Sequence, residues 1–575
     1  MKKTIFITLV LLFVSCTLSI AQPTLSPLVD CTASKTQLIF QPNQVRCLVG
    51  QVGYIFPNDD TSARFQVPYQ RVNSPATIFS SGFWIGGKDA FGNLKVSAAT
   101  YFNQTASNAD YWAGPLDSAG LTRAADCSKW NKIWSVTRAD ILAHLADIRD
   151  GRIDQPNTAV LGWPAVGNPY FRQYNGFDLP TFNKVLAPFF DANQDGKYNP
   201  LMGDYPLPEN VSNTLIPTQI TWCLFNDYGN AHTTTSRAIP LQAEIHVTTW
   251  GFDCTNNRLF NRTVFTAHKV INRSRVNIDS VSMGILTDFD IGCYTDDAVG
   301  CNPLTNTFYG YNAALLEPDS CSFGIRTYPK SPPAEAVTFL NRPLSKFIAY
   351  TNLGACPASP AYLDIPSTGF GVYNALNGRW GNGTPLTFGG TGYNIGAATN
   401  FMFPDDPTNT TGWSQVAGNF GCALDRVSVG STYVGTFRPN DTIRLDAAWS
   451  FHQDTSLNAW QNASLLRREI PSIQTWYNNR FQNACTLPTE TADTEGVVFS
   501  VSPNPVQTVL TLNFGEETLK HVRLVNIMGQ ILLNEIKNDY KSAVLDVSLL
   551  PNGLYLIETD FEGKKGRVQK VVIEK

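Results

Sequence analysis

The feature that most constrains this chain is a long series of short alternating segments between about residues 216 and 460. Glu244–Trp250, Val264–Ile271 and Ile443–Phe451 each alternate apolar and polar side chains. A period of two is that of a β-strand with one buried face, and clusters of turn residues separate the segments. We therefore predict a mainly β fold, in which residues 216–485 form a central region rich in β-sandwich structure with a few short helices.

Residues 22–215 are predicted to form an N-terminal β-rich region with a helical insert. Phe83–Leu94 runs from an aromatic segment into a Gly/Asp/Asn turn, which is typical of a β-hairpin. A helix is predicted over 137–149, where apolar residues recur at helical spacing: Ile141, Leu142, Leu145 and Ile148. A second helix is predicted over Ala463–Phe481, with Pro471 expected to kink or split it.

Composition narrows the class of protein. Charged residues make up 16% of the chain, against an average of about 25%. The net charge is −4 and the sequence has no basic cluster, which argues against nucleic-acid binding. The stretch Leu363–Gly418 is so rich in Gly, Asn, Thr and Pro that we expect long surface loops there.

The first residues have the pattern of a secretory signal peptide. Two lysines are followed by an apolar run, Ile5–Val14, and by small residues that end at Ala21. The run is shorter than the roughly 20 residues of a membrane span, so cleavage near Ala21 is expected. A loose lipobox at Phe13–Cys16 leaves open the alternative that Cys16 becomes a lipidated first residue. No later segment is long and apolar enough for a transmembrane helix, so we predict a mature chain that is secreted or on the outer cell surface.

Twelve cysteines are present, and export to an oxidising compartment permits disulfide bonds. Cys293 with Cys301, and Cys31 with Cys47, are plausible local pairs. The connectivity itself cannot be deduced from sequence.

A linker is predicted at 486–496, and residues 497–575 contain seven short alternating segments, as in a small Ig-like β-sandwich. Ser502–Pro505, Met528–Gln530 and Pro551–Gly553 are turn motifs that punctuate this module. In this order and at this end, the module resembles the type A sorting domain of the type IX secretion system of Bacteroidetes. The resemblance implies recognition by the type IX secretion machinery and export across the outer membrane.

The region before the linker also carries motifs that resemble those of other proteins. Phe83–Gly87, Asp110–Asp117, Gly203–Pro206 and Phe225–His232 occur in an order that resembles a group of uncharacterised type IX-secreted proteins. The resemblance covers most of residues 50–310. It implies origin and architecture, and it brings no activity with it.

One loop has the spacing of a calcium site. Carboxylate or amide side chains stand at positions 1, 3 and 5 and glycine at position 6, as in EF-hands and dockerins. Lys197 would contribute its carbonyl oxygen, and position 12 is Met202 where an EF-hand has Glu, so Asp204 is the substitute. The predicted ligands of a structural Ca²⁺ are Asp191, Asn193, Asp195, Lys197, Asn199 and Asp204. A polar turn without metal is the alternative.

A second acidic cluster consists of Asp288, Asp290, Asp296 and Asp297. Alternation places Asp288 and Asp290 on one face of a strand. Three uses remain open: a second cation site, a solvated loop, or the general acid and base of a glycoside hydrolase.

We interpret the chain as a non-enzymatic secreted or cell-surface β-protein, stabilised by calcium and disulfides, that binds an extracellular glycan, matrix component or protein. The sequence has no G-x-S-x-G, H-E-x-x-H or P-loop motif. The alternative is a secreted hydrolase of polysaccharide or peptide that uses the Asp288/Asp290/Asp296/Asp297 cluster. Exposed tryptophans could stack on sugars, and the candidates are Trp84, Trp112, Trp163, Trp380 and Trp413.

Overall fold

The structure of the chain is a computed structural model. It describes residues 30–575 except 59–62, 71–73, 102–108, 183–184, 234–235, 322–323, 352–363, 416–424, 483, 486–496, 498, 527–530, 563 and 566–568. The signal peptide and the linker predicted from the sequence lie outside these residues. The chain divides into two compact units, Met1–Cys485 and Thr486–Lys575, which we call the body and the C-terminal unit.

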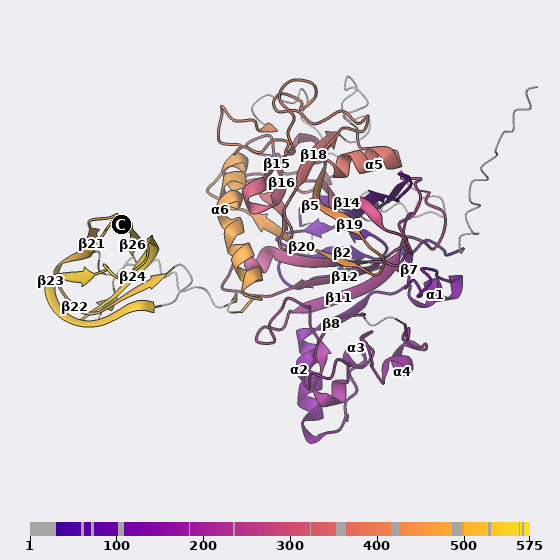
Figure 1. The fold of residues 1–575 in the computed structure, drawn as a ribbon, viewed down its shortest axis with the longest axis horizontal. Helices are drawn as coiled ribbons and strands as arrows, with labels where there is room; N and C mark the ends of the chain where they lie inside the picture. Colours follow the sequence, from indigo (N-terminus) through magenta and orange to yellow (C-terminus); the bar gives the residue numbers. More distant parts are fainter. Residues whose placement is uncertain are drawn as a thin grey trace, which may run out of the picture. The chain divides into compact units, whose positions relative to one another are not determined.

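The body is built on two antiparallel sheets (Figure 1). The first has nine strands. In spatial order they are β15 (Asp297–Asn302), β16 (Thr307–Asn312), β17 (Ala334–Phe339), β20 (Thr442–His452), β13 (Thr263–Asn272), β12 (Ala243–Gly251), β11 (Gln219–Asn226) and β7 (Trp112–Ala113), with β8 (Trp134–Thr137) also paired to β11. The strands predicted around Glu244, Val264 and Ile443 are β12, β13 and β20.

The second sheet has seven strands. Its order is β18 (Lys346–Thr351), β19 (Arg426–Phe437), β14 (Ile278–Phe289), β5 (Ala76–Lys88) and β3 (Tyr54–Phe56), with β4 (Phe65–Gln66) and β6 (Leu94–Ala98) also paired to β5. Strands β5 and β6 form the predicted hairpin. Because β5 pairs with β14, residues from before and after position 216 build the same sheet.

The two sheets pack face to face as a β-sandwich, and the nine-stranded sheet has a second covered face. On β13, Val264 and Val270 point into the core between the sheets. Phe265 and Ala267 point into a second core on the opposite face. This alternation buries both sides of the strand, so β13 is buried along nearly its whole length although it also carries polar side chains.

Helix α6 (Ala459–Asn478) covers the second face through Leu466, Ile470 and Ile473. The predicted helix is confirmed, but it is not split, because the helical backbone continues through Pro471. The same core includes buried residues of the helical insert, from α2 (Arg138–Asp147), α3 (Thr158–Leu161) and α4 (Phe171–Asn175). The insert also contains α1 (Ala124–Lys129) and the 3₁₀ turn η1 (Ile148–Asp150). Helix α2 matches the prediction, and its N-cap Thr137 forms a capping box with Asp140.

The small elements complete the body. Two two-stranded sheets are β1 (Gln37–Phe40) with β2 (Cys47–Gly50) and β9 (Phe189–Phe190) with β10 (Tyr205–Pro206). Further 3₁₀ turns are η2 (Pro200–Met202), η3 (Phe260–Arg262), η4 (Tyr294–Asp296) and η5 (Pro303–Thr305).

The described part of this segment, residues 364–415, consists only in part of the surface loops that its composition suggested. It contains helix α5 (Gly369–Leu376) and contributes Trp380, Met402 and Trp413 to the core between the sheets. Gly and Asn supply the left-handed backbone of its turns, as at Gly392. Tight turns therefore carry large side chains inward.

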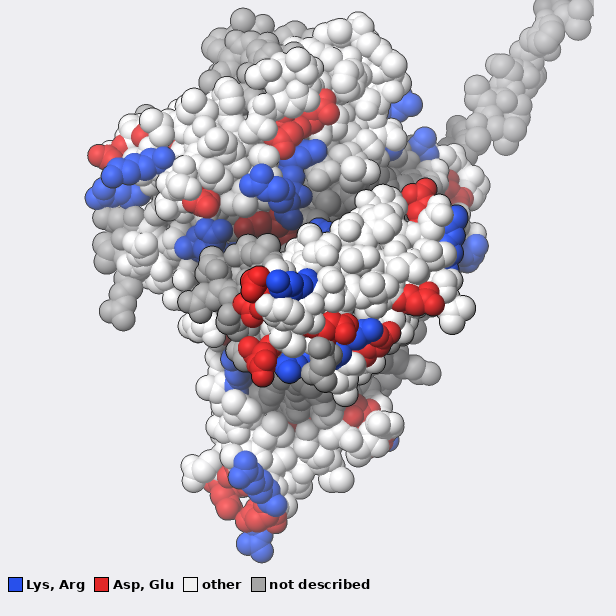
Figure 2. Space-filling view, turned by 90° about the vertical axis from the view of Figure 1, so that its left-hand side faces the viewer, with Lys and Arg blue, Asp and Glu red and all other residues white. Residues whose placement is uncertain are grey.

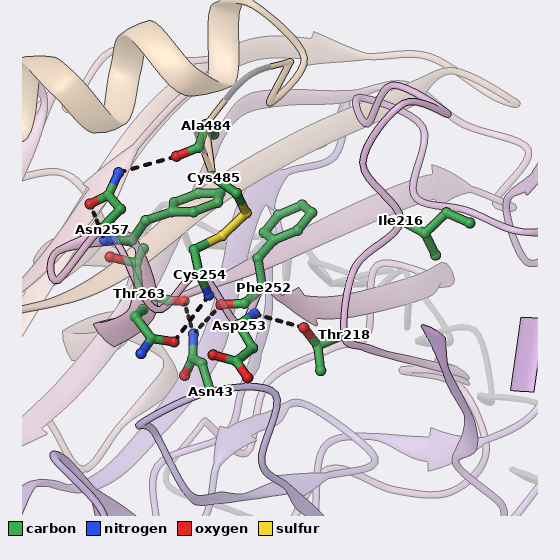
Figure 3. The surroundings of a disulfide bond; sticks show 12 residues. Asn43, Ile216, Thr218, Phe252, Asp253, Cys254, Asn257, Thr263, Ala484 and Cys485 are labelled. Atoms are coloured by element: carbon green, nitrogen blue, oxygen red, sulfur yellow. Dashed lines mark hydrogen bonds between the residues drawn. A yellow bond between two sulfur atoms is a disulfide. The ribbon is translucent and has the colours of Figure 1, made fainter. Parts of the chain in front are cut away.

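Two disulfide bonds are present among the described cysteines, Cys31–Cys127 and Cys254–Cys485. The suggested pairs Cys31–Cys47 and Cys293–Cys301 are wrong, because Cys47 and Cys301 are each buried separately in the core. Figure 3 shows Cys254–Cys485 beside a hydrogen bond that the Asn257 side-chain amide donates to the Ala484 carbonyl oxygen, at 3.1 Å. The end of the body is thus fastened to the loop after β12.

The C-terminal unit is a β domain, as predicted. Its strands are β21 (Ser500–Ser502), β22 (Val509–Asn526), β23 (Ile531–Asp546), β24 (Gly553–Phe561), β25 (Lys564–Lys565) and β26 (Gln569–Ile573). They are fewer and longer than the seven predicted segments. The register between β22 and β23 shifts between Asn513 and Thr518, where Gly515 has φ +65°, so a bulge bends one strand instead of separating two.

Candidate metal and ligand sites

The loop from Asp191 to Asp204 folds back on its own acidic side chains. The Asp191 carboxylate accepts hydrogen bonds from the backbone amides of Asp195 (3.2 Å) and Gly196 (2.8 Å). The amide of Lys197 donates to Asp195 at 2.7 Å. Gly196 has φ +73°, a conformation that glycine adopts without strain and that the sharp turn at this position requires.

Asp204 closes the loop from its far end. Its two carboxylate oxygens accept bonds from the amides of Ala192 and Asn199, both at 2.8 Å. Burial, and the nearby charges of Asp191 and Asp195, raise the pKa of Asp204 above its usual range. The structure therefore brings three carboxylates to one loop, where a cation would offset their repulsion.

The side chains of the other predicted ligands make hydrogen bonds elsewhere in the loop or are exposed. Asn193 donates its side-chain amide to Asp195, and Asn199 accepts from the Leu201 amide as the N-cap of η2. Lys197 is exposed. In this conformation the loop does not bring three carboxylate oxygens within 4.8 Å of one another. Another part of the described body does.

That other part is the end of β14. One ligand oxygen each from Asp288, Asp290 and Asp425 lies within 4.8 Å of the others, the only such group of three acidic, His or Cys side chains among the described residues. Asp288 is the second-last residue of β14, and Asp290 follows the strand. Asp425 precedes β19, whose Val427 pairs with Asp288. Sequence reasoning missed Asp425, because its only signal is the pairing of two strands far apart in the chain.

Burial and proximity act on these carboxyls in the same direction. Burial and then the charge of Asp425 raise the pKa of Asp288 and of Asp290 well above the usual range. Asp288 is 1% exposed and Asp290 9%. These groups lie inside the protein and not in an open cleft.

Asp296 and Asp297 separate from the other two predicted members. The buried Asp297 carboxylate accepts from the Ile291 amide at 3.2 Å, at the crossing from β14 to β15. Asp296 accepts from the Asn312 side chain at 3.3 Å. The predicted cluster of four is therefore a pair, Asp288 and Asp290, that is completed by Asp425.

An open groove lies at another place on the body, along α6. It has a volume of about 630 Å³ and lies between the β15–β16 turn, the β17–β18 turn and the middle of the helix. Its lining combines apolar and amide side chains with one arginine: Leu304, Thr305, Asn306, Leu340, Asn341, Arg342, Pro343, Ile470, Pro471, Gln474 and Asn478. This lining contains no Asp, Glu, His or Cys. Leu304 is 94% exposed, so an apolar side chain stands in solvent at the rim.

The tryptophans suggested as sugar platforms are all buried. Trp84, Trp163 and Trp380 are 0% exposed, Trp112 is 2% and Trp413 is 4%. They belong to the packed interior and cannot stack on a ligand.

Charge is scattered on the surface. On the face in Figure 2, acidic and basic side chains are interspersed and most of the described surface is uncharged. No helix among the described residues is long and apolar enough to cross a membrane.

Comparison with known proteins identifies the C-terminal unit. Residues 500–574 match the family described as the secretion system C-terminal sorting domain. The interpretation of this unit is confirmed, and the chain is a substrate of the type IX secretion system that is exported to the cell surface or the extracellular space. No curated protein matches the chain.

Two solved structures overlap loosely with the chain. A polysaccharide lyase is 7% identical over 65% of this chain and 37% of its own length, with a TM-score of 0.18. The BSP domain of a biofilm-associated protein is 9% identical over 64% of this chain and 63% of its own, with a TM-score of 0.12. The chain thus spans less than two thirds of either protein, and neither overlap defines a shared fold.

Proposed function

We propose that the exported body is a non-catalytic binding protein, which holds an extracellular glycan in the groove along α6 and is stabilised by Ca²⁺ at the Asp191–Asp204 loop. The observation that carries the proposal is the chemistry of the groove lining. A volume of about 630 Å³ lies within the range of ligand sites. Amide side chains such as Asn306, Gln474 and Asn478 donate to and accept from hydroxyl groups, and Leu304 offers an apolar surface.

Catalysis is the less favoured function. Glycoside hydrolysis needs two carboxyl groups that flank a substrate in an accessible site. The groove lining has none, and Asp288 and Asp297 are 1% and 0% exposed. Their burial favours a structural role for the acidic residues that the hydrolase alternative requires.

Binding is tested with the mature full chain on a panel of soluble polysaccharides, by calorimetry and by release of reducing ends. We expect saturable binding of at least one glycan without turnover. Leu304→Asp and Gln474→Ala should each weaken it by about tenfold or more, as expected for residues in direct contact.

Leu316→Asp is the matched control, because Leu316 is also exposed, at 61%, and is not part of the groove lining. The Leu316→Asp variant should bind the glycan with the affinity of the wild type. If Leu304→Asp and Gln474→Ala also bound it with wild-type affinity, the groove would not be the binding site. Turnover that Asp290→Asn abolishes would establish the hydrolase instead.

A further inference from the structure

Asp288, Asp290 and Asp425 meet where two neighbouring strands of the seven-stranded sheet end. Strands β14 and β19 are antiparallel, so the end of one lies beside the start of the other. The Asp290 backbone amide donates a hydrogen bond to the Thr77 carbonyl oxygen at 3.0 Å, which fixes the backbone just beyond β14. The three carboxylates are therefore placed by sheet pairing and not by a mobile loop tip.

Asp288 is poorly satisfied in this position. Its side chain is 1% exposed, and neither carboxylate oxygen has a well-formed hydrogen bond among the described residues. The polar groups that lie close to it are the buried Tyr101 hydroxyl and the Asp425 carboxyl. A buried ionised carboxylate in this position costs several kcal/mol, and a bound cation would offset that cost.

The cationic side chains nearby do not take the place of that cation. The buried Arg426 guanidinium interacts with Asp425 and Asp297, and it is not among the groups that shift the pKa of Asp288. Asp290 adds its negative charge to those that Asp288 and Asp297 already experience. The region has more carboxylates than one arginine can neutralise.

We propose that Asp288, Asp290 and Asp425 bind one Ca²⁺ inside the sandwich, at the ends of β14 and β19. Ligands that are all oxygens suit a hard cation. Oxygens on opposite sides of a Ca²⁺ ion, each at 2.3–2.6 Å, are about 5 Å apart. The three carboxylate oxygens lie within 4.8 Å of one another and can therefore contact one such ion. This site is separate from the Asp191–Asp204 loop and does not depend on the proposed glycan binding.

The proposal is tested with the mature full chain that carries Asp191→Ala, so that the loop site cannot contribute. Ca²⁺ alone is titrated into metal-free protein by calorimetry, and the unfolding temperature is followed as Ca²⁺ rises. We expect one Ca²⁺ per chain and a rise in unfolding temperature with Ca²⁺ concentration. Adding Asp425→Asn or Asp290→Asn should weaken this binding by about 100-fold or more, since each removes one charged ligand.

Asp279→Asn is the matched control, because Asp279 is an exposed carboxylate on the same strand, β14. It should leave both the stoichiometry and the affinity unchanged. The proposal is overturned if the Asp191→Ala chain binds no Ca²⁺, or if Asp425→Asn and Asp290→Asn bind it as before. Tryptophan fluorescence verifies folding of each variant, and the two positions provide independent tests should one variant fail to fold.

Discussion

The ring of Phe308 on β16 covers Gly430 on β19, in the opposite sheet. A Cβ at position 430 would lie 2.3 Å from the ring, too close for any real contact. The relationship is reciprocal, because Phe289 on β14 covers Gly310 on β16, where a Cβ would lie 2.4 Å from that ring. The two sheets interlock through these pairs of one large and one absent side chain.

Gly430→Ala should therefore destabilise the body by about 1–3 kcal/mol, the usual cost of overpacking a core. Gly381→Ala is the control, because a Cβ there meets nothing within 4 Å, and its effect should be within about 0.5 kcal/mol. Denaturant unfolding followed by tryptophan fluorescence measures both, since all 12 tryptophans lie in the body. Equal stability of the two variants would contradict the interlock.

A third disulfide bond should join Cys293 and Cys321. The two thiols lie against each other, and burial and this contact raise the pKa of Cys321 to about 12. An oxidant such as a disulfide-exchange protein outside the cytoplasm takes up the two electrons and two protons released when the S–S bond forms. Alkylation without reductant, followed by peptide mapping, should recover a linked Cys293–Cys321 peptide.

The buried Cys47 provides the internal comparison for this mapping, because it has no disulfide partner and should be alkylated once the chain is unfolded. Alkylation of Cys293 and Cys321 in the unreduced, unfolded protein would disprove the third bond.

Calcium at the Asp191–Asp204 loop should stabilise the body. Ca²⁺ at about 100 times its dissociation constant adds about 2.7 kcal/mol to the free energy of unfolding. Asp191→Ala should abolish the part of this calcium-dependent stabilisation that comes from the loop. Stabilisation by calcium bound at any other site should remain. Asp178→Ala, at an exposed acid paired with Arg172, should keep the full calcium response. If neither chelation nor Asp191→Ala changes the unfolding temperature, the loop is a metal-free turn.

His268 should make the body less stable in acid. It is stacked on Phe83 in the core between the sheets, and burial lowers its pKa to about 3 from an unfolded value near 6.5. Between these values the unfolded chain binds a proton that the folded chain does not, so the free energy of unfolding falls as pH falls. The loss is about 1.4 kcal/mol per pH unit.

His268→Leu removes this term, because leucine does not titrate. Comparing denaturant unfolding at pH 6.5 and 4.5, the wild type should lose about 2 kcal/mol more than the variant. The other titratable groups are common to both proteins and cancel. If the free energy of unfolding fell equally in the wild type and the variant, burial would not lower the pKa of His268 in the folded state.

The local elements of the body could be predicted because their side chains have the period of the element. Strands β12, β13 and β20 alternate regularly, and helix α2 has both apolar spacing and a capping Thr137. Helix α5 could not be predicted, since its sequence, GFGVYNAL, contains two glycines and is apolar nearly all round. Its packing on the sheet, and not its propensity, maintains it.

Contacts between residues far apart in the chain could not be predicted from the sequence. Asp425 joins Asp288 only because β19 pairs with β14, and Cys254 joins Cys485 across 231 positions. Composition was also misleading where irregular backbone carries large side chains inward, as at Trp380 and Trp413. Spacing alone predicts a site when one loop supplies it, and not when tertiary packing does.

The disulfide at Cys485 has a consequence for the maturation of the exported chain. Cys485 directly precedes the linker predicted at 486–496, and its bond to Cys254 holds the last turn of the body in place. A peptidase that cuts within 486–496 would remove the sorting domain and leave a new carboxyl terminus already tethered a few residues upstream. Unfolding that starts at the new carboxyl terminus is therefore stopped at the disulfide bond before it reaches α6. The sorting domain can be removed without destabilising the body.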